Sequence, residues 1–110
     1  MQAKKLPKDF AYLTDMYEDD YFPAFLVDKI KAAIEDVVGF LEQGNSSNAE
    51  IQAALDKMTL KINHLQEEFE ENDSELETEA RESIGATIDE ILRFFDVDID
   101  GEEALREREW

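Results

Sequence analysis

One stretch of the chain has oxygen ligands at the spacing of a calcium-binding loop. Residues 96–107 fit the pattern Asp-x-Asp-x-Asp-Gly-x5-Glu, with Gly101 at the sharp turn and candidate ligands Asp96, Asp98, Asp100 and Glu107. Only three residues follow Glu107, too few for an exiting helix, and there is no second loop to pair with the first. Because 29 of the 110 residues are acidic, such a pattern also arises by chance. We expect no metal site outside these four residues, and calcium binding at 96–107 remains an alternative function.

Residue types that enzymes use for covalent or metal catalysis are scarce. The chain has no cysteine and one histidine, His64, which excludes thiolate chemistry and histidine-rich metal sites. The four glycines are scattered rather than gathered in a phosphate-binding loop, and the serines fall in loops, at predicted helix caps or on helix faces. We predict that the protein is not an enzyme and binds no cofactor.

Carboxylates and aromatic side chains are abundant instead. They interleave in residues 17–23, and a second acidic run at residues 67–73 has no Lys or Arg close by in the chain. An aromatic anchor supplies apolar contact area while acids attract a basic partner. For Tyr17 and Tyr21, packing and binding stay equally open, whereas Phe22 and Phe25 are expected to fill the end of the core. The candidate partner-binding residues are Tyr17, Glu18, Asp19, Asp20, Tyr21, Glu67, Glu68, Glu70, Glu71 and Asp73.

Helices must position these residues, because apolar residues recur at intervals of three and four almost throughout. The stripes predict long helices over 23–41, 47–69 and 76–95, a short helix over 9–17 and a last helical turn or two within 101–110. Ser47 and Ser74 each precede a glutamate at the spacing of a capping box. Gly85, inside the third long helix, suggests the close approach of a neighbouring helix. The predicted fold class is all-α: one domain, residues 1–110, forming a small antiparallel bundle of three long helices plus a short N-terminal helix.

Helix directions bring the two acidic runs together. Short connections make consecutive helices antiparallel, so the start of the first long helix, the end of the second and the start of the third share one end of the bundle. Residues 67–71 lie at a helix C-terminus, where the carbonyl groups disfavour negative charge, so stability does not explain their acids. A solvated face without a partner is the competing interpretation. We call this end the acidic pole, and it comprises Asp15, Glu18, Asp19, Asp20, Glu67, Glu68, Glu70, Glu71, Asp73, Glu75, Glu77 and Glu79.

The acidic pole leads to a functional prediction. We expect a non-enzymatic interaction protein whose pole docks a basic protein, as an inhibitor, an immunity protein or an adaptor. A decoy that mimics nucleic acid is a further alternative, but it would need carboxylates in a long regular row. The net charge of -18 disfavours direct contact with nucleic acid or an anionic membrane. No apolar run is long enough to span a membrane and residues 1–8 lack a secretory signal, so we expect a cytoplasmic protein, of open oligomeric state.

Two segments carry a resemblance to a known family. Residues 17–29 (YEDDYFPAFLVDK) and residues 68–82 (EFEENDSELETEARE) are similar to a family of small, acidic, uncharacterised bacterial proteins of about this length. The similarity covers nearly the whole chain, including Trp110. It implies a bacterial, single-domain protein and transfers neither an activity nor catalytic residues. Both segments flank the acidic pole.

Overall fold

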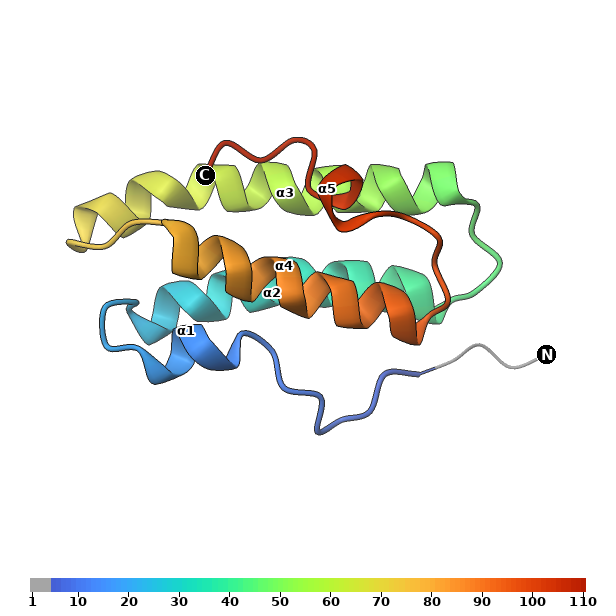
Figure 1. Cartoon of the computed structure of the whole chain (residues 1–110), viewed down its shortest axis with the longest axis horizontal. Helices are drawn as coiled ribbons and strands as arrows, with labels where there is room; N and C mark the ends of the chain where they lie inside the picture. Colours follow the sequence, from blue (N-terminus) through green and yellow to red (C-terminus); the bar gives the residue numbers. More distant parts are fainter. Residues whose placement is uncertain (1–4) are drawn as a thin grey trace.

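The computed structural model describes residues 5–110, and every regular element in that range is a helix (Figure 1). The predicted all-α fold class is confirmed. Three helices are long, with 19, 24 and 17 residues, and two are short. In chain order the helices are α1 (Thr14–Glu18), α2 (Ala24–Glu42), α3 (Asn48–Glu71), α4 (Thr78–Phe94) and α5 (Gly101–Ala104).

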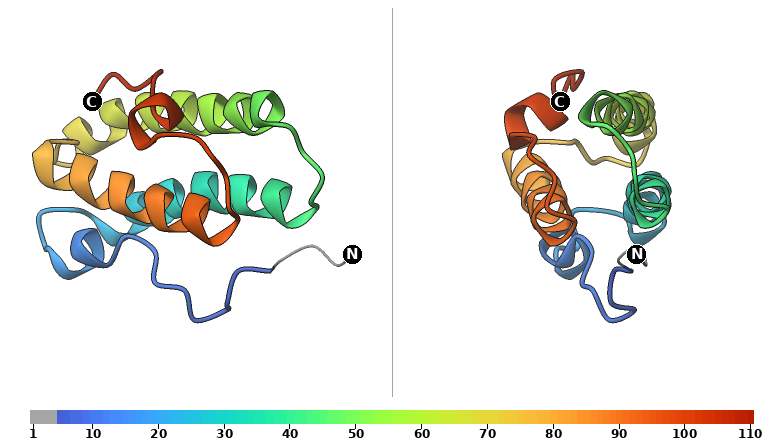
Figure 2. Two further views of the ribbon diagram at one scale, coloured as in Figure 1. Left: turned by 45° about the vertical axis from the view of Figure 1, so that its right-hand side comes forward. Right: turned by 90° about the vertical axis from the view of Figure 1, so that its right-hand side faces the viewer.

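The long helices run along the long axis of a molecule that measures 47 × 28 × 17 Å. Figure 1 shows α2, α3 and α4 in alternating directions. α2 and α3 pack directly against each other, whereas α4 contacts α1 on one side and α5 on the other. The end-on view in Figure 2 shows α5 and the C-terminal segment at a fourth corner, next to α3 and α4. The C-terminal segment therefore completes the helical packing instead of lying outside it.

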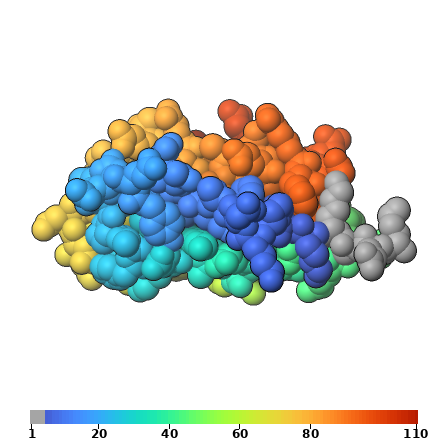
Figure 3. Space-filling view, turned by 90° about the horizontal axis from the view of Figure 1, so that it is seen from below, coloured from blue at the N-terminus to red at the C-terminus, as the bar shows by residue number. Residues whose placement is uncertain are grey.

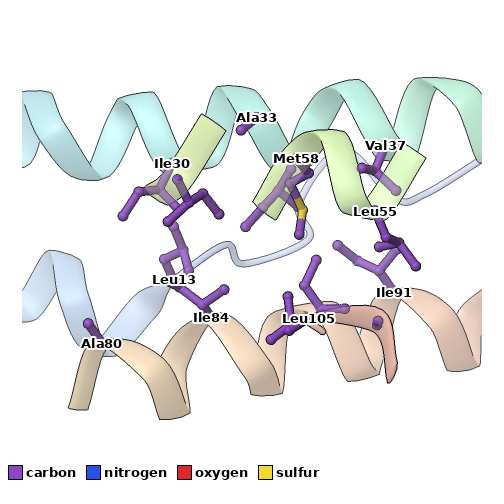
Figure 4. Close-up of a cluster of buried hydrophobic side chains, with 14 of the residues drawn as sticks. Leu13, Ile30, Ala33, Val37, Leu55, Met58, Ala80, Ile84, Ile91 and Leu105 are labelled. Atoms are coloured by element: carbon purple, nitrogen blue, oxygen red, sulfur yellow. The ribbon is translucent and has the colours of Figure 1, made fainter. Parts of the chain in front are cut away.

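Apolar stripes of the helices form one core. The predicted stripe of α3 is buried from Ile51 to Phe69, with Leu55 and Ile62 fully enclosed. Figure 4 shows side chains from α2, α3, α4 and the C-terminal segment meeting in this core. Gly85 does not mark a close approach, because a Cβ placed there would meet nothing within 4 Å, so that prediction is wrong.

One of the two predicted capping boxes is present. At the start of α3, Ser47 Oγ accepts the Glu50 N–H at 3.1 Å and the Glu50 carboxylate accepts the Ser47 N–H at 3.0 Å. Hydrogen bonding to the backbone N–H of Ser47, and to its side chain, lowers the pKa of the Glu50 carboxyl. The capping box predicted at Ser74 is wrong, because α4 begins only at Thr78 and has no side-chain cap. Ser74 belongs to the end of α3, where its N–H bonds the Phe69 carbonyl at 2.8 Å.

Helices α3 and α4 each end in a Schellman motif. Asp73 and Asp96 occupy its left-handed position, with φ of 58° and 56°. In each case the N–H of the next residue bonds a carbonyl of the last helical turn, at 2.8 and 2.9 Å. Glycine is the usual residue at this position because it has no Cβ, and aspartate tolerates the conformation better than most residues. These two acids therefore have a structural role as helix stops.

The segment before α1 is not helical. The helix predicted over 9–17 begins only at Thr14, because Leu13 has φ of 52°. The side chain of Leu13 is fully buried, between Ile30 and Ile84 in Figure 4, and its N–H faces Thr87 Oγ1 at 3.3 Å. Figure 3 shows this segment, in blue, lying between α2 and α4. Long-range contacts, rather than helix propensity, determine its path.

Candidate docking site at the acidic pole

The acidic pole lies at one end of the long axis. Figure 1 shows α1, the start of α2, the end of α3 and the start of α4 together at the left of the view. Glu75 and Glu77 precede α4, and Glu77 is its N-cap residue without a capping hydrogen bond. Only Glu79 lies in the first turn. The helix dipole therefore does not explain Glu75.

Two pairs of carboxyl groups are in hydrogen-bond contact within the pole. A hydrogen bond with the Glu77 carboxyl, together with its charge, raises the pKa of Glu75. A hydrogen bond with the Asp19 carboxyl, which comes from the other side of the pole, raises the pKa of Glu79 in the same way. A raised pKa in exposed carboxyl groups means that their ionised forms repel each other. The pole thus concentrates negative charge that the fold does not neutralise.

One cation reaches the pole from a distant part of the sequence. Lys29 on α2 pairs with Glu68 on α3, with 2.5 Å between Nζ and Oε1. Within residues 5–110, no other acid of the pole takes part in an ion pair. Sequence reasoning missed this contact because nothing local relates residues 39 positions apart. Glu68 therefore contributes to helix packing, whereas Glu67, Glu70 and Glu71 have no cationic partner among the described residues.

Exposed aromatic side chains accompany the carboxylates. Tyr17, Tyr21 and Phe25 are 38%, 43% and 53% exposed. The Tyr17 hydroxyl donates to Asp28 Oδ1 at 2.5 Å, and partial burial together with this bond raises the pKa of Tyr17. Desolvation and the charges of Glu77 and Glu75 likewise raise the pKa of Tyr21. Both tyrosines keep a large accessible ring surface beside carboxylates.

The two phenylalanines at the start of α2 have opposite environments. Phe22 is buried, as predicted, and packs edge-on against Phe69 with 6.5 Å between ring centroids. The prediction that Phe25 fills the core is wrong, since more than half of its surface is exposed. The buried face of α2 is occupied by Leu26 and Ile30, and Phe25 lies outside that stripe. The helical phase of the α2 stripe is the sequence signal that could have shown this.

The candidate calcium ligands are distributed over the connection from α4 to the C-terminal segment. Asp96 ends α4, and Asp100 caps α5 by accepting the Glu102 N–H at 3.4 Å. The backbone carbonyl of Glu107 accepts a hydrogen bond from the Asn63 side chain at 2.8 Å. Across residues 5–110, no three His, Cys, Asp or Glu side chains are grouped so that they could hold a metal ion. Residues 96–107 thus end α4, begin α5 and attach the C-terminal segment to α3.

Comparisons with known proteins add a family. No helix in the described part of the chain is both long enough and apolar enough to cross a membrane. No curated protein and no solved structure matches the chain. A family of unknown function, DUF5713, matches residues 6–110, a range that contains the five helices and the acidic pole. The chain therefore belongs to the DUF5713 family.

Proposed function

We propose that this protein is a non-enzymatic interaction protein whose acidic pole docks a basic protein, as an inhibitor, an immunity protein or an adaptor. The observation that carries the proposal is the exposure of Tyr17, Tyr21 and Phe25 beside paired carboxylates at one end of the molecule. Aromatic rings bury a large area at low cost in side-chain entropy, which is why they serve as anchors in protein interfaces. The bacterial, cytoplasmic setting expected from the sequence is part of this proposal.

The paired carboxyl groups support a partner rich in arginine. Glu75 with Glu77, and Asp19 with Glu79, bring like charges into contact in the free protein. A guanidinium group placed between two carboxylates would replace this repulsion by charge-assisted hydrogen bonds, which are the strong class of such bonds. Association with a basic surface therefore relieves an unfavourable interaction as well as forming a favourable one.

Matched alanine variants test whether the aromatic side chains anchor a partner. Phe25 and Leu60 are both exposed apolar residues on helices, at 53% and 45%, but only Phe25 is at the acidic pole. We expect wild type to capture a basic protein from the cytoplasmic fraction of the bacterial host. Phe25→Ala should weaken that complex about tenfold or more, whereas Leu60→Ala should stay within about twofold, as measured by surface plasmon resonance with the purified partner.

A charge variant tests the role of the acids. Glu70→Gln with Glu71→Gln removes two repelling charges from the C-terminus of α3, so stability should rise by about 0.3–1 kcal/mol. Under the proposal the same variant also associates more slowly with the basic partner, because exposed charges steer encounters. Raising the salt concentration should remove most of this difference. Exposed charges act over about 8 Å at physiological ionic strength, and added salt shortens this distance further.

Three results would contradict the proposal. A captured partner with an acidic surface would remove its basis. Equal affinity of wild type and Phe25→Ala would show that the exposed ring is not an anchor. A charge variant that is more stable yet unchanged in affinity and association rate would show that the acids form a solvated face.

A further inference from the structure

A second surface feature lies away from the acidic pole, between α2 and α3. A cavity of about 360 Å³ opens there, and its apolar lining includes Ala33, Val37, Ala54 and Met58. Figure 4 shows Ala33 and Val37 on α2 close to Met58 on α3. The small side chains of the two alanines leave room that larger residues would fill. The volume falls at the lower end of the range of small-molecule sites, roughly 300–1,000 Å³.

Within residues 5–110, two ion pairs join α2 to α3 across this face, and the series ends within the cavity. Lys29 pairs with Glu68, and further along Asp36 pairs with Lys61 at 2.9 Å, each pair joining α2 to α3. By the same antiparallel register, Lys57 lies opposite Phe40, and both line the cavity. Within residues 5–110, Lys57 takes part in no ion pair.

Several lysines and arginines of residues 5–110 take part in no ion pair, and Lys57 is the one among them that lines the cavity. Asp and Glu number 29 against 11 Lys and Arg, so acidic partners are plentiful. On α2, the position that would continue the series of ion pairs opposite Lys57 is occupied by Phe40 instead of an acid. The cavity therefore combines apolar residues with the ion pair of Asp36 and Lys61 and with the charge of Lys57, which no acid of the described residues pairs.

We propose that this cavity binds an apolar monocarboxylic acid, with the carboxylate at Lys57 and the hydrocarbon over Ala33, Ala54 and Met58. The apolar lining favours a hydrocarbon chain, because burial of apolar surface supplies most of the binding free energy of such a ligand. The ammonium group selects an anionic end over a neutral one. The net charge of -18 repels multiply charged anions such as phosphates much more strongly than a single carboxylate.

Octanoate and 1-octanol are the probes that test this site, because they share an apolar chain and differ in charge. We expect octanoate to give saturable NMR shifts of the backbone amides of Ala33, Ala54 and Met58, with a dissociation constant of about 1 mM, as a ligand of ten heavy atoms allows. Octanol should bind about three- to tenfold more weakly, since it cannot form the ionic contact with Lys57.

Two substitutions that remove the same charge isolate the role of Lys57. Lys57→Gln should weaken octanoate about three- to tenfold and leave octanol unchanged, whereas Arg108→Gln, on the exposed C-terminal segment, should leave both within about twofold of wild type. Ala54→Leu should abolish binding of both probes by filling the cavity. Because Lys57 is exposed, its replacement leaves the fold intact even where Ala54→Leu does not.

Several outcomes would overturn the proposal. They are equal affinity for octanoate and octanol, an equal effect of Lys57→Gln and Arg108→Gln, and octanoate shifts confined to residues outside the cavity. Absence of saturable shifts with octanoate at about 10 mM would also overturn the proposal, since this concentration exceeds the expected dissociation constant about tenfold. Undiminished binding to a folded Ala54→Leu variant would place the ligand elsewhere.

Discussion

At Asp73, in the acidic pole, substitutions can separate the effect of backbone geometry on stability from the effect of charge. It has φ of 58°, and its N–H bonds the Glu70 carbonyl at 3.2 Å, so that it ends α3 in a left-handed conformation. That conformation costs an ordinary L-residue roughly 1–2 kcal/mol, because Cβ approaches the following carbonyl oxygen. Glycine avoids this cost but gives up about 0.5–1 kcal/mol through its larger freedom in the unfolded chain. The free-energy cost of aspartate at this position lies between those of glycine and alanine, because aspartate tolerates the left-handed conformation.

We therefore expect opposite effects from two substitutions at this position. Asp73→Gly should raise the free energy of unfolding by about 0.3–0.5 kcal/mol, and Asp73→Ala should lower it by a similar amount. The resulting spread of about 0.5–1 kcal/mol corresponds to roughly 3–5 °C in melting temperature for a chain of this length, measured by circular dichroism. Both variants remove one negative charge, so relief of charge repulsion cancels when the two are compared.

One result of this comparison would refute the assigned conformation of Asp73. If Asp73→Ala melts at the same temperature as Asp73→Gly, or above it, the left-handed end of α3 is not the conformation in solution. The docking proposal adds a second expectation, because both variants lose the same charge. Their association rates with a basic partner should then fall by equal factors, although their stabilities differ.

Four further predictions concern the core, the charges and the alternative function. Gly85→Ala should stabilise the protein by about 0.5–1 kcal/mol in thermal unfolding, because a Cβ meets nothing there; a loss of stability would show a close contact. Leu55→Asp, at a fully buried position, should cost several kcal/mol, and melting within about 2 °C of wild type would contradict its burial. The raised pKa values of Glu75 and Glu79 contribute stability that is present below their ordinary value of 4.5 and lost as pH rises through the raised values. Urea unfolding should therefore show higher stability at pH 5 than at pH 7, a trend that Glu79→Gln weakens. Calcium at millimolar concentration should not raise the melting temperature beyond the effect of equal magnesium; a specific rise that Asp96→Asn abolishes would favour calcium binding at 96–107.

Features that depend on near neighbours in the chain were predictable. The apolar stripe of α3 and the capping box of Ser47 with Glu50 follow from helical periodicity and from hydrogen bonds that span three residues. The all-α class follows for the same reason. Composition likewise points to an acidic surface, because 29 acids cannot be buried in a chain of 110 residues without partners.

Errors arose where a residue had two local interpretations and a distant contact decided between them. Ser74 has the spacing of an N-cap, but its N–H closes the end of α3 instead. Leu13 fits a helical stripe, but its buried side chain and the Thr87 hydroxyl hold it in a left-handed conformation. Phe25 adjoins a buried phenylalanine, yet it lies outside the buried face of α2.

The sequence by itself determined the helical elements and the excess of negative charge, since both are set by residue type and by spacing within a few turns of helix. Only the tertiary structure decided which carboxyl groups share hydrogen bonds, which lysine neutralises Glu68, and which lysine lines the cavity without an ion-pair partner among residues 5–110. Those properties depend on the register between α2 and α3 and on the path of residues 72–77 across the pole. Register is fixed by the packing of the whole core, in which residues far apart in the chain come into contact, and no local pattern specifies those distances.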